Sequence, residues 1–271
     1  MSSFSSLYNR IYEHNAKNSE YITNFRKNPY SYVKARYYFF TANIIVYLLQ
    51  NINFNPRLIS FFYILQGFIA MILLNVENQT LNLVAIFLFF SKGTLDWADG
   101  HYARLKNQTS LTGHILDIYG ARLNSVFFLI SLGFYQYLKY ENIYFLFMVI
   151  LLPIFMLGYF EKYAYQLIFN NFGLNKFIKN SSKKKFNPGK DNKFFKVKYL
   201  FLNILDDRSR SIDFILLCLI IEIYFEFKIS YILFFFIFVK WLIIWLYSLF
   251  FHTSMYWAEN IISRKEKDIF K

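Results

Sequence analysis

The stretch ISYILFFFIFVKWLIIWLYSLFF, residues 229–251, contains a single charged side chain, Lys240. Because a helix rises about 1.5 Å per residue, about 20 apolar residues cross the roughly 30 Å hydrocarbon core of a bilayer. Five further apolar segments match this length or approach it with the help of flanking helix: 58–74, 81–97, 123–138, 143–165 and 212–227. The sequence therefore predicts an all-α integral membrane protein with a bundle of six transmembrane helices.

Composition excludes the other fold classes. Hydrophobic residues make up 56% and aromatic residues 23% of the 271 residues, with only 9 Gly and 4 Pro. So few turn-forming residues argue against a turn-rich β-sandwich or barrel, and the apolar content excludes disorder over most of the chain. The single cysteine, Cys218, excludes an internal disulfide framework and a cysteine-based zinc site.

The positive charge lies beside particular apolar segments. The formal net charge is +13, and Lys and Arg gather in residues 1–36, 162–210 and 257–271, whereas residues 75–80 contain none. By the positive-inside rule, both termini and the loop at about 166–210 are predicted to be cytoplasmic. This asymmetry accounts for the basic excess without nucleic acid, since no recognisable nucleic-acid-binding motif accompanies it. We expect a multi-pass protein with membrane lipid as its surroundings.

The segment before the first span differs from the spans. Residues 37–49 are apolar but short and follow basic residues, which favours an amphipathic helix on the membrane surface, with a seventh span as the alternative. No signal-peptide pattern opens the sequence and no internal repeat occurs, so we expect neither a cleaved leader nor an inverted-repeat transporter. The predicted organisation is a cytoplasmic segment with the interfacial helix (1–56), a six-helix domain (57–256) and a cytoplasmic tail (257–271).

Acidic residues gather where the second predicted span ends and the third begins. The second span ends in DWADGHYAR, residues 96–104, and the third begins with GHILDIYGAR, residues 113–122. Positions three or four apart share a helix face, so Asp96 and Asp99 line one side of the second span, and Asp117 lies on the third. If the two helices pack as a hairpin, three carboxylates converge near the cytoplasmic surface.

This cluster indicates a metal site that handles phosphates. Three close carboxylates repel one another unless cations lie among them, and oxygen ligands near phosphate favour Mg²⁺ or Mn²⁺. Gly100 and Gly113 leave the backbone open to a bulky ligand, and Arg104 offers a forked cation for phosphate oxygens. The chemistry suggested is phosphoryl-type transfer from a diphosphate. The alternative is a hairpin of ion pairs, but Arg104 alone does not balance three acids.

The spacing of these residues resembles the signature of a known family. The pattern Asp-x2-Asp-Gly-x2-Ala-Arg-x8-Gly-x3-Asp-x3-Asp is that of the CDP-alcohol phosphotransferases, also called CDP-alcohol phosphatidyltransferases. The chain matches seven of the eight fixed positions: Asp96, Asp99, Gly100, Ala103, Arg104, Gly113 and Asp117. At the first span, NPRLIS (residues 55–60) loosely resembles the family's Pro-Asn-x-x-Thr entry, with the Asn displaced.

The resemblance implies a fold and a reaction. Family members look like six-helix membrane proteins that transfer a substituted phosphate from a CDP-linked donor to an alcohol acceptor and release CMP. By resemblance, Asp96, Asp99 and Asp117 are ligands of two divalent metal ions. The residues that the resemblance assigns to the nucleotide are Gly100, Ala103, Arg104 and Gly113. It also implies a homodimer and an active site that faces the cytoplasm.

The eighth position departs from the pattern. The family has there an Asp that serves as metal ligand and general base, and this chain has Ala121, which can do neither. The chain is therefore either a natural inactive or divergent member or one with an introduced Asp-to-Ala substitution. The undisturbed flanks at 119–120 and 122–125 favour the introduced substitution. His101 and His114 flank the site and are the candidates to replace the base, although local hydrogen bonding is their more ordinary role.

Other charged residues have two interpretations each. Arg208 and Arg210 precede the fifth span and either hold the phosphate of a polar substrate or anchor the helix at the membrane surface. Lys240 lies in the middle of the sixth span, where it either pairs with Glu222 of the fifth or extends toward lipid.

The sequence leaves two substrate branches open. CDP-diacylglycerol with a polar alcohol makes a phospholipid, whereas a CDP-linked head group needs a lipid or glycan acceptor. The alternative function is a catalytically dead membrane scaffold or nucleotide-binding protein of the same fold. A transporter is disfavoured because the acids lie at a span end and not at the bilayer midplane.

Overall fold

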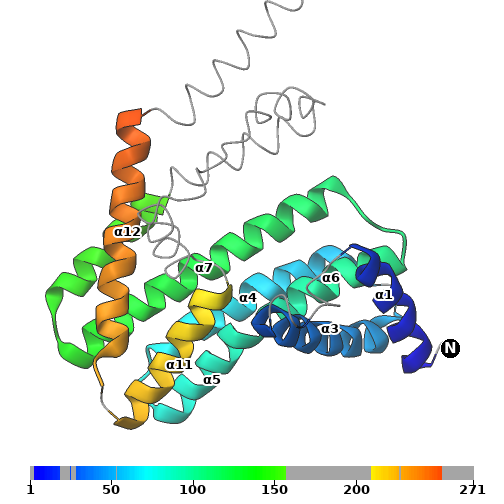
Figure 1. The fold of residues 1–271 in the computed structure, drawn as a ribbon, viewed down its shortest axis with the longest axis horizontal. Coiled ribbons are helices and arrows are strands. Elements are labelled where there is room, and N and C mark those ends of the chain that lie inside the picture. The colour runs from blue at the N-terminus through cyan, green and yellow to red at the C-terminus, as the bar shows by residue number, and fades with distance from the viewer. Residues whose placement is uncertain are drawn as a thin grey trace, which may run out of the picture. The chain divides into compact units, whose positions relative to one another are not determined.

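The computed structural model describes residues 3–18, 25, 29–52, 54–156, 209–225 and 227–251. Within these ranges every extended regular element is a helix and no strand occurs, which confirms the predicted all-α class (Figure 1). The labelled helices are α1 (Phe4–Asn18), α3 (Pro29–Leu49), α4 (Pro56–Leu74), α5 (Gln79–Ser91), α6 (Gly93–Leu105), α7 (Leu111–Tyr140), α11 (Ser209–Phe225) and α12 (Ile229–Phe251). The chain forms two compact units, Met1–Ser131 and Leu132–Lys271.

Among the described residues, four helical segments are long and apolar enough to cross a membrane: Pro56–Leu74, Gln79–Leu105, Thr112–Tyr140 and Ile229–Leu246. The second of these combines α5 and α6. The predicted spans 143–165 and 212–227 correspond to the shorter described helices Ile143–Met156 and α11, so six spans remain a prediction. The predicted cytoplasmic tail and almost all of the 166–210 loop lie outside the described residues.

The first unit is built around α3, α4, α5 and α6. Figure 1 shows α4 and α5 side by side, and α3 packs along α6. Asn55 caps α4 by accepting a hydrogen bond from the Arg57 N–H at 3.0 Å, and Pro56 supplies the fixed φ that suits the first helical position. Asn78 caps α5 in the same way. Local sequence therefore sets where these two helices begin.

The segment predicted as a short interfacial helix, residues 37–49, is the C-terminal part of the longer α3. One side of α3 contributes Phe39, Ala42 and Val46 to a core shared with α1 and α6. Its other side exposes apolar residues, among them Val33 and Leu48 at 60% and 68% exposure. The exposed apolar side suits a membrane surface, and that placement stays a prediction.

The junction of α5 and α6 is fixed by side chains from α3. Lys34 Nζ and Tyr38 Oη each donate a hydrogen bond to the Phe90 carbonyl oxygen at 2.9 Å. Gly93, the first residue of α6, lies so close to the Tyr38 ring that a Cβ atom there would collide with it. These contacts set where α6 starts, and α6 carries the acidic residues of the motif.

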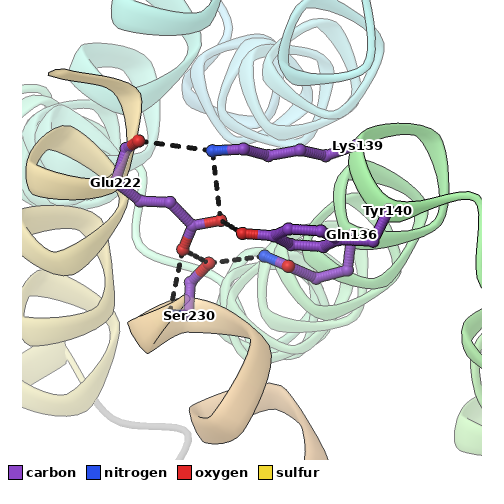
Figure 2. Close-up of polar contacts among 5 residues, drawn as sticks. All are labelled: Gln136, Lys139, Tyr140, Glu222 and Ser230. Atoms are coloured by element: carbon purple, nitrogen blue, oxygen red, sulfur yellow. Dashed lines mark hydrogen bonds and ion pairs between the residues drawn. The ribbon is translucent and has the colours of Figure 1, made fainter. Parts of the chain in front are cut away.

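The second unit contains a buried polar cluster around Glu222 of α11 (Figure 2). Glu222 is fully buried and accepts hydrogen bonds from the Tyr140 hydroxyl and the Ser230 N–H at 3.0 Å each, and from the Ser230 hydroxyl. Lys139 Nζ lies 3.4 Å from Glu222 Oε1, and Gln136 donates to Ser230 Oγ. Lys139 of α7 is therefore a cation at this carboxylate, and the pairing of Glu222 with Lys240, one of the two interpretations of that lysine, stays a prediction. Lys240 is itself buried, with its Nζ 5.6 Å from the Trp241 ring centroid.

Candidate functional site

A cavity of about 690 Å³ opens in the first unit between the start of α4, the end of α6 and the start of α7. Six of the motif residues line it: Asp99, Gly100, Ala103, Arg104, Gly113 and Asp117. The two halves of the motif lie on different helices, and two of the three carboxylates predicted to converge, Asp99 and Asp117, line the same cavity. The remaining lining residues come from the two residues before α4, from the first turns of α4 and α7, and from the loop before α7.

The three carboxylates of the motif lie close together. The Asp96 carboxyl group is within hydrogen-bonding reach of the Asp117 carboxyl group and also close to Asp99. Asp99 and Asp117 face the cavity, whereas Asp96 is not among the lining residues. Three like charges at this separation repel one another unless a cation or a proton lies among them.

Ser60 of α4 holds one of these carboxylates, a contact that the sequence reasoning missed. Its hydroxyl donates to Asp99 Oδ2 at 2.5 Å, and both residues are buried. The loose similarity of NPRLIS to the family's entry motif was the available signal, because Ser60 is the last residue of that stretch. Ser60 joins α4 to the motif helix and fixes the orientation of Asp99.

Arg104 and two glycines shape the wall of the cavity. A Cβ atom on Gly100 would lie 3.4 Å from both Nη atoms of Arg104, so the guanidinium group lies over Gly100. Ser110 caps α7 by accepting a hydrogen bond from the Gly113 N–H at 3.1 Å. The N-terminal end of α7 therefore lies at a cavity that already contains Arg104, and both the helix dipole and the guanidinium group favour anions there.

The connection from α3 to α4 is fastened to α6. The Tyr102 hydroxyl donates to the Ile52 carbonyl oxygen at 2.6 Å and accepts from the Phe54 N–H at 3.1 Å. Lys106 Nζ donates to the Gln50 carbonyl oxygen at 2.9 Å. Because Tyr102 is fully buried, these bonds hold the start of α4 against the motif helix.

The model of the CDP-alcohol phosphatidyltransferase family matches residues 53–170. The chain carries a CDP-alcohol phosphatidyltransferase domain. The matched residues include every residue that lines the cavity. Neither the curated proteins nor the solved structures gave a significant match to the chain. The matched family consists of transferases that act on CDP-alcohols, and the four apolar helices among the described residues indicate an integral membrane protein.

The carboxylate cluster of the matched segment offers the kind of ligand that a divalent cation prefers. CDP-alcohol phosphatidyltransferases generally use divalent metal ions, and three clustered carboxylates are the hard oxygen ligands that such ions prefer. As the side chains stand, no three carboxylate, histidine or cysteine groups in the described part of the chain are arranged to hold a metal ion. Asp99 is turned toward Ser60. The charge and the oxygen ligands of the three carboxylates therefore suit a divalent ion, but their side chains are not oriented around a common metal position.

The two histidines beside the motif have different surroundings. His114 lines the cavity of the domain at the first turn of α7. His101 is buried in the core, where its ring contacts Phe39 and Trp97 with centroids 5.4 Å and 5.9 Å away. Of the two candidates for a replacement base, His114 alone lies on the cavity wall.

Ala121 lies one turn beyond Asp117 on α7 and is not among the lining residues. Its carbonyl oxygen accepts a hydrogen bond from the Ser125 hydroxyl at 3.1 Å. Of the two arginines expected at a substrate phosphate, Arg208 lies outside the described residues, and Arg210 lies in the first turn of α11 without a described side chain. Their role stays a prediction.

Proposed function

We propose that this chain is a membrane-embedded transferase that moves a substituted phosphate from a CDP-linked donor to an alcohol acceptor and releases CMP. The observation that supports this function is one cavity lined by motif residues from both α6 and α7. The cavity volume of about 690 Å³ is in the range of small-molecule sites and accommodates a nucleotide diphosphate.

In this proposal the carboxylates and the arginine divide the work of binding the donor. Asp96, Asp99 and Asp117 hold Mg²⁺ or Mn²⁺, in a site for two ions. When bound, the ions neutralise the diphosphate and the leaving CMP. Arg104 binds nucleotide phosphate oxygens through its forked N–H groups. Gly100, Ala103 and Gly113 leave room for the cytidine because they present little or no side chain.

The proposed transfer is an attack by the acceptor hydroxyl on the donor phosphorus farther from the cytidine. A new bond forms between that oxygen and phosphorus, the phosphorus–oxygen bond to CMP breaks, and the hydroxyl proton must pass to a base. Ala121 stands where the family has that base, so we propose that this chain turns over slowly or not at all. With CDP-diacylglycerol the product is a phospholipid, and with a CDP-linked head group it is a modified lipid or glycan.

We further propose that the cavity and both termini face the cytoplasm and that the protein is a homodimer. The orientation is supported by the concentration of Lys and Arg before the first span and in the 162–210 segment. The dimer is supported by the family resemblance.

The second candidate is a catalytically dead scaffold or nucleotide-binding protein of the same fold. Ala121 is the specific observation in its favour, since a chain that binds a CDP donor and lacks the base retains the nucleotide without transferring its phosphate.

Calorimetric titration of CDP tests the part that both candidates share. We expect binding in Mg²⁺ or Mn²⁺ and a large loss of affinity in chelator, because the diphosphate and three carboxylates otherwise repel one another. Equal affinity in both buffers contradicts the metal site. Release of CMP from CDP-diacylglycerol or CDP-linked head groups then separates the transferase from the scaffold.

A further inference from the structure

The cavity contains a second arginine that lies outside the family motif. Arg57 lines the cavity from the first turn of α4. Its backbone N–H is bound to Asn55, so the position of the residue is fixed by the helix cap. Its guanidinium group makes no hydrogen bond, ion pair or ring contact with the part of the chain that the structure describes. Arg57 is therefore a cation on the cavity wall whose described surroundings do not neutralise it.

The position of Arg57 follows from its spacing to Ser60. Ser60 follows Arg57 by three positions, which corresponds to about 4.5 Å of rise along α4 and to the same helix face. Since Ser60 binds Asp99 at 2.5 Å, Arg57 lies one helical turn from Asp99 toward the start of α4.

The other two helices at the cavity, α6 and α7, also carry charged or titratable residues on its wall. On α6, Arg104 follows Asp99 by five residues, and on α7, His114 precedes Asp117 by three. Among the residues that line the cavity, Asp99 and Asp117 are the carboxylates. The Arg104 side chain reaches back over Gly100, next to Asp99, whereas Arg57 lies about one turn from Asp99 along α4, so both arginines stand near the two carboxylates of the described cavity.

We propose that Arg57 binds a phosphate group of the substrate as a second cation beside Arg104. This inference rests on the proposed function, because that function brings a diphosphate into the cavity. A guanidinium group binds phosphate through two parallel N–H···O bonds, which Lys cannot reproduce. The N–H groups in the first turns of α4 and α7 add to the positive potential at the same wall. Two sources supply this chemistry: the donor diphosphate, or a phosphate carried by the acceptor.

The test compares Arg57→Gln, Arg57→Lys and the control Arg10→Gln. Arg10 is exposed on α1 and does not line the cavity. Each protein is titrated by calorimetry, in Mg²⁺, with CDP, with cytidine, and with inorganic phosphate after saturation with CDP. Cytidine reports whether the nucleoside site is intact, since it carries no phosphate.

If the donor diphosphate is the ligand, we expect Arg57→Gln to weaken CDP binding roughly tenfold to a hundredfold and to leave cytidine unchanged. Arg57→Lys should lie between wild type and Arg57→Gln, and Arg10→Gln should match wild type. If the acceptor phosphate is the ligand, CDP affinity is unchanged and the loss appears in the titration with inorganic phosphate. Either result supports an anion site at Arg57.

Unchanged binding of both CDP and inorganic phosphate in Arg57→Gln overturns the inference and leaves Arg57 as a solvated surface cation. That result does not affect the proposed function so long as CDP binds. Conversely, a wild-type chain that binds no CDP in Mg²⁺ contradicts the proposed function, and the inorganic phosphate titration of the same proteins without CDP still decides the role of Arg57. Absence of both CDP and phosphate binding overturns the two together.

Discussion

Ala121 is the residue on which catalysis depends in this interpretation. It follows Asp117 by one helical turn, so an acidic side chain at that position points toward the same carboxylate cluster. Its absence from the cavity lining agrees with a methyl side chain that is too short to reach the cavity. Restoring a carboxylate would add both a base and a metal ligand at the point where the acceptor hydroxyl must lose its proton.

We expect Ala121→Asp to raise the rate of CMP release at least a hundredfold with a matching pair of donor and acceptor. A positioned general base contributes about 10²–10⁴ in rate. The gain, measured by chromatographic detection of CMP, should disappear in chelator. If the Ala121 protein is already fast, His114 is the residue to replace next, because it lines the cavity. If Ala121→Asp stays inert with both donor classes, the scaffold interpretation gains support.

Ser60 is a positioning residue that acts through Asp99. We expect Ser60→Ala to weaken Mg²⁺-dependent CDP binding roughly tenfold to a hundredfold, because loss of a residue that orients a metal ligand has an effect of this size. Ser60→Thr keeps the hydroxyl and should retain most of the affinity. Ser131→Ala is the matched control, since Ser131 is also buried but, within the described part of the chain, donates its hydrogen bond to its own helix at Phe128.

The Ser60 titrations are repeated over a range of Mg²⁺ concentrations. A shift in the Mg²⁺ needed for half-maximal binding of CDP, with cytidine affinity unchanged, is the signature of a positioning role. Equal losses in Ser60→Ala and Ser131→Ala indicate a general effect of removing a buried hydroxyl and contradict that role.

The sequence predicts which site residues come together when those residues are close to one another along the chain. Asp96, Asp99 and Asp117 lie within one hairpin, so helical spacing alone brings them to one region. Ser60 and Asp99 are 39 residues apart, and their contact depends on how α4 packs against α6. Spacing along one helix carries no information about such a contact, which is why the roles of Ser60 and Arg57 follow from the structure and not from helical periodicity.

In the second unit, too, contacts between different helices cannot be predicted from the sequence pattern of one helix. The apolar runs predict α11 and α12, but the packing of α7, α11 and α12 determines which side chains contact Glu222. Lys139 Nζ of α7 lies 3.4 Å from Glu222 Oε1 of α11, so the ion pair joins two residues that are 83 positions apart in sequence (Figure 2). Lys139 Nζ also donates to the Glu222 carbonyl oxygen at 3.2 Å.

Replacing Lys139 and replacing Glu222 should lower the free energy of unfolding by different amounts. Lys139→Met should lower the free energy of unfolding by about 3 kcal/mol, because it leaves a carboxylate buried without its cation. Glu222→Gln should cost less, since the Lys139 side chain is 27% exposed and can be hydrated, whereas that of Glu222 is 0% exposed. The double variant should be more stable than Lys139→Met alone, because no uncompensated buried charge remains.

Unfolding in mixed detergent micelles measures these differences. Glu77→Gln serves as the control, since Glu77 is exposed in the loop between α4 and α5 and should change stability by less than about 0.5 kcal/mol. A double variant that is less stable than either single variant contradicts the account, because it implies that the buried charge itself is not what makes Lys139→Met costly.

Across the whole chain, the sequence predicts the class of protein better than its exact number of spans. The apolar runs predict the all-α class and the motif predicts the family domain, because each of these patterns lies in a short continuous stretch of sequence. The span count is harder, since α11 has 17 residues and Ile143–Met156 is shorter still. Length alone does not separate a short span from a helix that packs within a bundle. The charge pattern supplies the remaining large-scale prediction, which is the orientation.

The orientation can be tested at the two ends of one span. The segment Gln79–Leu105 separates the loop with Glu77 from the loop with Thr109, which lines the cavity. Its 27 residues correspond to about 40 Å of helix, enough to place the two loops on opposite sides of a bilayer. The loop at residues 75–78 contains no Lys or Arg, whereas both predicted cytoplasmic segments are rich in them.

We therefore expect Glu77→Cys to react with a membrane-impermeant maleimide in intact cells and Thr109→Cys to react only after permeabilisation. Both variants are made in a Cys218→Ala background, because Cys218 is the single cysteine of the chain. Labelling of both after permeabilisation shows that each thiol is reactive. The reverse pattern in intact cells would place the cavity outside the cytoplasm, away from a supply of CDP-linked donors, and would contradict the proposed orientation while leaving the binding chemistry of the cavity unchanged.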